Sequence, residues 1–154
     1  MGSNLDDPPA QLESALGSLA GLPDSRLARV SSFYRNPPVG YRDQPDFVNA
    51  VAMLETRLAP RDLLARLLAI EDARGRARSF PNAPRPLDLD IALYGDRVIA
   101  ESDLTIPHPR LHERAFVLVP LAEIAPETLV PGKGRVADLA RLVDSSMLIR
   151  LSGS

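Results

Sequence analysis

The chain has 154 residues, a formal net charge of −2, 45% hydrophobic and 25% charged residues, and no cysteine. This composition predicts one globular domain, residues 1–154, with enough chain to bury a sizeable core. The charge balance does not favour a nucleic-acid partner, the lack of cysteine excludes disulfides and thiolate metal sites, and no apolar run is long enough to span a membrane. No signal-peptide pattern opens the chain, so we expect a cytoplasmic protein.

A first helix is predicted directly after Asp6 and Asp7. Either aspartate can serve as its N-cap, and the two prolines that follow suit the first turn of a helix. Apolar residues then recur at helical spacing until Gly21, where the pattern ends. This helix therefore has one apolar face to bury.

Two strands are predicted at residues 27–34 and 47–55, joined by a proline-rich loop, 35–45. In the second strand Asn49 lies on an apolar face with Phe47. A buried amide needs hydrogen-bond partners. Asn49 therefore either bonds to nearby backbone or recognises the amide-like edge of a heterocycle, with Phe47 as a flat surface beside it.

An amphipathic helix is predicted over residues 60–74. Glu71 falls on its leucine stripe, so this carboxylate is either an edge residue or a buried acceptor. Glutamate is rarely fully buried, which favours the edge. The residues expected to face inward are Leu63, Leu64, Leu67, Leu68 and Ile70.

Strict alternation from Leu87 to Tyr94 predicts a half-buried strand, followed by a turn at residues 95–96 and a hairpin partner at 97–99. Asp88 and Asp90 share its polar face, roughly 6.5–7 Å apart along the strand. Two carboxylates so close repel each other unless a cation lies between them, and a set of oxygen ligands suits Mg²⁺. The alternative is a solvated polar face.

Four arginines crowd the approach to this aspartate pair. Cations beside a carboxylate pair indicate an anionic ligand bridged by metal, and two Mg²⁺ ions about 4 Å apart could hold a polyphosphate. The four are Arg74, Arg76, Arg78 and Arg85.

The C-terminal part of the chain contains both histidines. His108 and His112 have a spacing compatible with zinc, but the prolines around His108 argue against a shared helical face. Helices are predicted at residues 113–124, interrupted or kinked by a proline, and at 136–143. The tail 147–151 has β character.

The run 84–91, Pro-Arg-Pro-Leu-Asp-Leu-Asp-Ile, resembles the signature of the 6-hydroxymethyl-7,8-dihydropterin pyrophosphokinase family of folate biosynthesis. The resemblance extends in family order from residue 2 to about residue 130. Further matching segments are Gly2-Ser3-Asn4-Leu5, Ser31-Ser32-Phe33-Tyr34-Arg35, residues 43–50, Ile70-Glu71, Gly75-Arg76, Pro107-His108, Arg114-Ala115-Phe116 and residues 120–127.

The resemblance implies an α+β fold, a ferredoxin-like α/β sandwich with an antiparallel sheet flanked by helices. The family's first strand is missing here, because only Met1 precedes Gly2. The implied reaction transfers the pyrophosphoryl group of MgATP to the pterin hydroxymethyl oxygen and leaves AMP. We expect a monomer whose partners are ATP and 6-hydroxymethyl-7,8-dihydropterin, with no nucleic acid and no membrane.

The resemblance also implies three groups of site residues. Asp88 and Asp90 match the pair that holds two Mg²⁺ ions, and together with Arg76 and Arg85 they are the expected catalytic residues. The expected pterin-binding residues are Pro37, Val39, Phe47, Asn49 and Phe116. The expected nucleotide-binding residues are Glu71, Arg78, Arg85, Ile91, Thr105, His108 and Arg114.

Two departures from the family pattern leave alternatives open. The loop 79–84 lacks the family's tryptophan-glycine pair, so aromatic stacking from it falls to Phe80 or is absent. The missing strand makes a relative that binds pterin or nucleotide without turnover the main alternative. A metal-dependent phosphohydrolase explains the two aspartates but not Phe47, Asn49 and Phe116.

The missing strand also leads to a structural hypothesis. Without it, residues 47–55 or 87–94 would expose an unpaired edge, which proteins usually cover. We therefore expect the tail 147–151, from the same chain or a neighbouring one, to pair at the vacant position.

Overall fold

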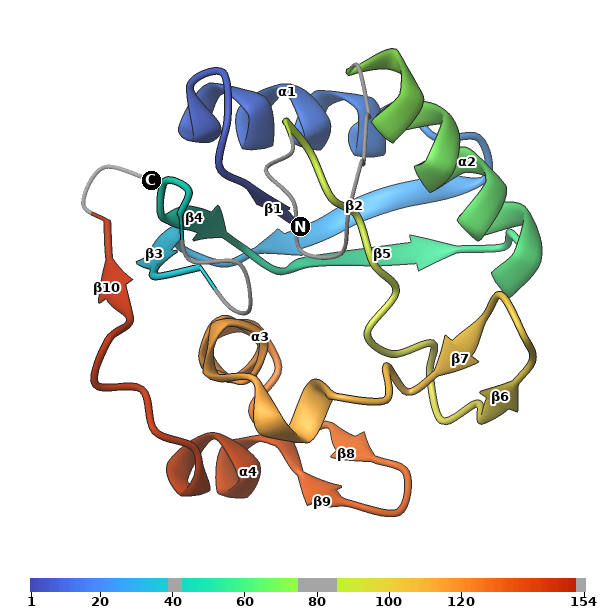
Figure 1. The fold of residues 1–154 in the computed structure, drawn as a ribbon. Coiled ribbons are helices and arrows are strands. Elements are labelled where there is room, and N and C mark those ends of the chain that lie inside the picture. The colour runs from blue at the N-terminus through green and yellow to red at the C-terminus, as the bar shows by residue number, and fades with distance from the viewer. Residues whose placement is uncertain (39–42, 75–85, 152–154) are drawn as a thin grey trace.

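The computed structural model of the chain describes residues 1–38, 43–74 and 86–151. Helices α1 (Pro8–Ala20) and α2 (Pro60–Ala73) cover one side of a layer of antiparallel strands, and α3 (Ala115–Ile124) and α4 (Val136–Leu142) lie on the other side (Figure 1). A short 3₁₀ helix, η1 (Leu111–Glu113), precedes α3. The described part of the chain thus has the mixed, antiparallel character of the predicted α+β class.

The strands of the described residues are short and belong to four antiparallel groups. The sheet orders are β1-β4-β3-β10, β2-β5, β6-β7 and β8-β9. The bounds are β1 (Gly2–Ser3), β2 (Ser25–Val30), β3 (Tyr34–Asn36), β4 (Phe47–Asn49), β5 (Ala52–Thr56), β6 (Ile99–Ala100), β7 (Thr105–Ile106), β8 (Leu129–Val130), β9 (Gly134–Arg135) and β10 (Ile149–Arg150).

The centre of the fold is a long antiparallel ribbon. The β2–β5 and β3–β4 ladders follow one another along it, because the chain passes directly from β2 to β3 and from β4 to β5. Ser31 N donates to Val51 O (2.9 Å) where the two ladders meet. The predicted strands 27–34 and 47–55 are therefore confirmed as extended segments, each interrupted near its middle.

Residues 2–3 form the strand β1, so the missing first strand is not confirmed. On one side β1 pairs with β4, Gly2 opposite Asn49. On the other side Gly2 N donates to Asp88 O (2.9 Å) and Asp88 N donates to Gly2 O (2.8 Å). These first residues tie the aspartate segment to the ribbon.

The hypothesis about the C-terminal tail is wrong in its partner. The tail does contain a strand, β10, but this strand pairs with β3, Ile149 opposite Arg35 and Arg150 opposite Tyr34. It lies at the edge of the sheet opposite to β1 (Figure 1). The composition of the tail predicts a strand, but it does not specify which exposed sheet edge that strand pairs with.

The predicted strand from Leu87 to Tyr94 is also corrected. Its only ladder contact within the described residues is the bridge from Asp88 to Gly2. The expected hairpin with residues 97–99 does not form, because Ile99 belongs to β6, which pairs with β7. Leu87 and Leu89 do pack in one core, but the consecutive Ala92 and Leu93 both pack against a second core. The alternation therefore ends halfway along the segment.

Two apolar cores lie on either side of the ribbon. The first joins α1 and α2 to the sheet, and the second joins α3 and α4 to its other side. Members of the first include Leu12, Ala15, Leu19, Val48, Ala50, Leu63, Leu67, Leu87 and Leu89; members of the second include Leu111, Leu118, Leu121, Val130 and Val136. Each fully buried leucine stabilises the fold by about 1.5–3 kcal/mol relative to an exposed one.

The helix boundaries agree closely with prediction, but two details of α2 and α3 differ. Leu68 was expected to face inward and is 37% exposed, because it lies one residue beyond the buried stripe of Leu63 and Leu67. Pro120 lies within α3 rather than interrupting it. No helix in the described ranges has the length and apolar character needed to cross a membrane.

Candidate active site

A cavity of about 530 Å³ lies between the ribbon, the segment 88–95 and α3. Its volume is in the range typical of small-molecule sites. Eight of the residues predicted for the site line it together: Phe47, Asn49, Asp88, Asp90, Ile91, His108, Arg114 and Phe116. The fold therefore brings into one cavity residues that are up to 69 positions apart in the chain.

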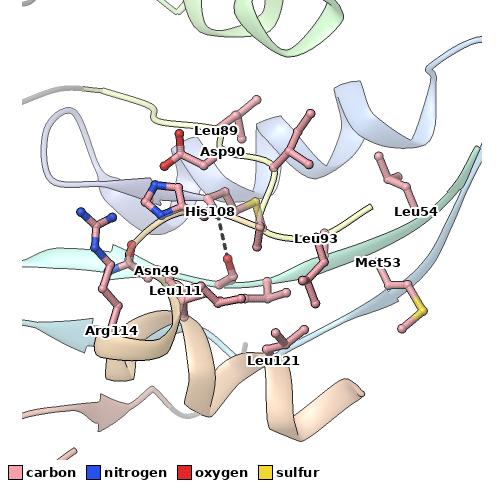
Figure 2. A pocket seen from close by; sticks show the side chains of 18 of the residues that line it. Asn49, Met53, Leu54, Leu89, Asp90, Leu93, His108, Leu111, Arg114 and Leu121 are labelled. Atoms are coloured by element: carbon pink, nitrogen blue, oxygen red, sulfur yellow. Dashed lines mark hydrogen bonds between the residues drawn. The ribbon is translucent and has the colours of Figure 1, made fainter. Parts of the chain in front are cut away.

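The cavity has a polar end and an apolar end. Figure 2 shows Asp90, His108 and Arg114 grouped at one end, while Met53 and Leu54 lie toward the other. Charged side chains gather at the first end, and aliphatic side chains line the second. The charged chemistry that the sequence predicted is thus concentrated in one part of the cavity.

The backbone of the aspartate pair is held from both sides. Asp88 exchanges two backbone hydrogen bonds with Gly2. Between the aspartates, Leu89 is 6% exposed in the first core, and its N–H donates to Glu71 Oε2 (2.6 Å). Asp88 and Asp90 therefore both line the cavity on a segment that packing and hydrogen bonds position.

Glu71 is a buried acceptor, so the interpretation as an edge residue is wrong. Its side chain is on the buried face of α2, and the residue is only 2% exposed. The hydrogen bond from Leu89 offsets part of the cost of burying a carboxylate. Glu71 is not among the residues that line the cavity, and it supports the aspartate segment from behind.

His108 is oriented by its neighbours. The backbone N–H of His108 donates to Ala92 O (2.9 Å), and its ring Nδ1 accepts from the Arg110 backbone N–H (3.2 Å). An accepting Nδ1 leaves the proton of the neutral ring on Nε2. Burial lowers the pKa of His108, and Arg114 and Arg110 lower it further against the opposing effect of Asp90 and Asp88.

A zinc site formed by the two histidines is not supported. His112 lies on η1, and only His108 is among the residues that line the cavity. Across the described ranges, no group of three or more histidine, aspartate or glutamate side chains gathers in a metal-binding arrangement. The cavity lining combines one imidazole, from His108, with the carboxylates of Asp88 and Asp90.

Arg114 and Phe116 stand together where α3 begins. The guanidinium carbon of Arg114 lies 5.4 Å from the centroid of the Phe116 ring, within the range of a cation–π contact. Arg114 is the residue before the helix, and both residues line the cavity. One side chain offers a charge and the other an aromatic face to the same space.

Asn49 is hydrogen-bonded to a side chain that the sequence analysis did not single out. Its Nδ2 donates to Asn36 Oδ1, and Asn36 Nδ2 donates to Pro37 O (3.1 Å). Both asparagines are buried, and both line the cavity. The only sequence signal for Asn36 is a polar residue at the end of a strand, directly before two prolines.

The other predicted site residues either lie elsewhere in the described structure or fall outside it. Pro37 and Thr105 are not among its lining residues, and Thr105 is exposed on β7. Four others, Val39, Arg76, Arg78 and Arg85, lie outside the described residues, as does Phe80.

Residues 1–126 match a family model described as 7,8-dihydro-6-hydroxymethylpterin-pyrophosphokinase. Proteins named 2-amino-4-hydroxy-6-hydroxymethyldihydropteridine pyrophosphokinase are similar over almost the whole chain. The one from Haemophilus influenzae is 44% identical over 99% of this chain and 95% of its own length, and the one from Pseudomonas aeruginosa is 44% identical over 100% and 95%. The Bacillus subtilis protein of that name is 42% identical over 80% of this chain and 74% of its own length.

Proposed function

The chain belongs to the 7,8-dihydro-6-hydroxymethylpterin-pyrophosphokinase family, and from this premise we propose that the cavity described above is where its reaction takes place. The enzyme transfers a pyrophosphoryl group from ATP to 6-hydroxymethyl-7,8-dihydropterin in folate synthesis. The hydroxymethyl oxygen forms a bond to the β-phosphorus of ATP, the bond from that phosphorus to the α,β-bridging oxygen breaks, and AMP leaves.

The observation that carries the assignment is the shared cavity. Phe47, Asn49 and Phe116 supply two aromatic rings and an amide, a set that suits a flat heterocycle with polar edges. Asp88 and Asp90 line the same cavity. A phosphohydrolase would need only the aspartates, so it does not account for the two aromatic rings and the amide. A relative without turnover is not favoured, because the residues suited to a pterin and the two carboxylates line one cavity.

The donor set at the aspartate pair fits magnesium. Two carboxylates on a held backbone supply oxygen ligands, and Mg²⁺ commonly takes its other ligands from water and substrate phosphates. We propose that Asp88 and Asp90 hold two such ions. When bound, they neutralise phosphate charge and lower the pKa of the attacking hydroxyl.

The residues at the polar end would bind and orient the polyphosphate. His108 presents its Nε2 as a donor, because Nδ1 accepts the Arg110 N–H, and Arg114 contributes a fixed positive charge. Both favour the negative charge of the transferring group, the main demand of phosphoryl transfer. We propose the same role for Arg76, Arg78 and Arg85, which lie between α2 and the aspartate pair in the sequence.

Several finer assignments belong to the same proposal. The antiparallel ribbon with α1 and α2 packed on one side supports the ferredoxin-like arrangement. A single domain over residues 1–154, a monomeric state, and pterin or nucleotide contacts by Pro37, Val39, Glu71, Ile91 and Thr105 are also proposed on the family's pattern.

Product analysis tests the proposed function. The purified chain is incubated with ATP and Mg²⁺, with and without 6-hydroxymethyl-7,8-dihydropterin, and the nucleotides are separated by chromatography. We expect AMP only when the pterin is present. No AMP under either condition would contradict turnover, and phosphate release without pterin would indicate a phosphohydrolase.

A further inference from the structure

Asn36 and Asn49 lie on the same face of neighbouring strands. In the β3–β4 ladder Asn36 is opposite Phe47, and Tyr34 is opposite Asn49. Directly opposite residues of an antiparallel pair share a face, so all four side chains point to the same side of the sheet. The Tyr34 hydroxyl donates to Glu123 of α3, which identifies this side as the one that faces α3 and Phe116.

The two amides form a directional chain of hydrogen bonds. Asn36 Nδ2 is committed to Pro37 O, so its Oδ1 faces Asn49 and accepts from Asn49 Nδ2. Rotating the Asn49 amide by half a turn would place its Oδ1 against Asn36 Oδ1, two acceptors facing each other. Asn36 therefore determines that Nδ2, and not Oδ1, of the Asn49 amide faces Asn36.

Gly2 constrains the other end of the Asn49 amide. A Cβ atom at position 2 would collide with Asn49 Oδ1, so that oxygen lies directly against the glycine backbone. The Asn49 side chain is thus enclosed between β1 and Asn36, and both asparagines are less than a tenth exposed. A buried amide in this setting has one orientation that satisfies its donors and acceptors.

We propose that Asn36 is a positioning residue that sets the specificity of the pterin subsite by fixing the orientation of the Asn49 amide. This inference rests on the proposed function of the cavity. The 2-amino-4-oxo edge of a pterin carries donors and acceptors in a fixed order, so it pairs with an amide in one orientation and not in the reverse one. A site that holds the amide in one orientation rejects a heterocycle whose 4-oxo acceptor is replaced by an amino donor.

Binding measurements with two ligands test the proposal. The intrinsic fluorescence of 6-hydroxymethylpterin and of 2,4-diamino-6-hydroxymethylpteridine reports their Kd values for the wild-type chain and for Asn36→Ala. We expect wild type to prefer the 4-oxo ligand, and Asn36→Ala to lose about tenfold of that preference, equivalent to about 1.4 kcal/mol. An unchanged ratio of the two Kd values would overturn the proposal.

Two further variants separate positioning from a general structural effect. Asn36→Asp retains an acceptor for the Asn49 N–H and should keep the preference for the 4-oxo ligand even if both Kd values rise. Arg35→Ala, on the opposite face of the same strand, should leave the ratio unchanged. Equal loss of preference in Asn36→Asp and Asn36→Ala would contradict the role of the Oδ1 acceptor.

Kinetics of the wild-type enzyme keep this inference distinct from the proposed function. In Asn36→Ala we expect KM for the pterin to rise about tenfold while KM for ATP stays within twofold of wild type. If wild type forms no AMP, the proposed function fails. If wild type is active and Asn36→Ala matches it in both KM and ligand preference, only the inference about Asn36 fails.

Discussion

Glu123 on α3 joins the helix layer to the segment that contains β3, and replacing it should lower the free energy of unfolding. Its Oε2 accepts from Ser32 N (2.9 Å) and Ser32 Oγ (3.0 Å), and its Oε1 accepts from the Tyr34 hydroxyl (2.6 Å). Arg150 of β10 also approaches this carboxylate, at 3.9 Å. One side chain therefore connects α3, the strand that carries Asn36, and the C-terminal strand.

The size of the effect follows from what Glu123→Ala leaves behind. The Ser32 backbone N–H and the Tyr34 hydroxyl both belong to buried residues and would lose their acceptor. An unsatisfied buried polar group costs about 1–3 kcal/mol, so two groups that relax in part toward water cost about 2–4 kcal/mol. Glu123→Gln keeps one oxygen for Ser32 and should cost only about 1 kcal/mol.

The pH dependence of this contribution has a definite sign. Burial raises the pKa of Glu123, but the hydrogen bonds from Tyr34 and Ser32 outweigh it, so the net pKa lies below its usual value. The stabilisation is therefore present above the unfolded pKa, about 4.3, and is lost as the pH falls through the folded pKa. Burial and the Glu123 carboxylate raise the pKa of Tyr34 to about 12, so its contribution is present below about pH 10 and is lost between pH 10 and 12.

Urea unfolding followed by circular dichroism at pH 7, 4 and 3 measures these effects. Tyr34→Phe, which removes one hydroxyl, provides the matched control at about 1 kcal/mol. We expect the difference between wild type and Glu123→Ala to shrink at pH 3. A difference below 0.5 kcal/mol at pH 7, against the roughly 1 kcal/mol of a single hydrogen bond, would refute the reasoning.

Four other substitutions test the site and the core. Asp90→Ala should lower kcat at least about 10³-fold with little change in the urea midpoint, because the side chain is exposed in the cavity; near-normal AMP formation would contradict the metal assignment. Gly2→Ala should raise KM for the pterin, since the new Cβ displaces Asn49, and an unchanged KM would show that the amide tolerates movement. Leu12→Ala should cost about 2–5 kcal/mol in urea unfolding and Leu68→Ala less than about 1, because Leu12 is 0% and Leu68 37% exposed; equal costs would contradict the assigned core.

The sequence by itself determined much of the local structure and named eight of the residues that line the cavity. Prolines in the first turn and helical spacing located α1 and α2 within one residue, because these signals act between near neighbours in the chain. Asp7 occupies the N-cap position of α1, but its side chain makes no capping hydrogen bond. The period of two placed Phe47 and Asn49 on one face of a strand, and both line the cavity. The same period placed Asp88 and Asp90 on one face, and both of them line the cavity as well.

Only the tertiary structure decided which backbone edges pair and which polar groups meet in the interior. The segment 87–94 has the pattern of a strand but makes a single bridge, and β10 pairs with β3 rather than at the position next to β1. The buried carboxylate of Glu71 accepts from the Leu89 N–H, 18 residues away in the chain. The buried amide of Asn36 accepts from Asn49 on the neighbouring strand. Periodicity shows which face of an element is apolar, but it cannot show which distant donor will satisfy a buried acceptor, because that depends on how the elements pack.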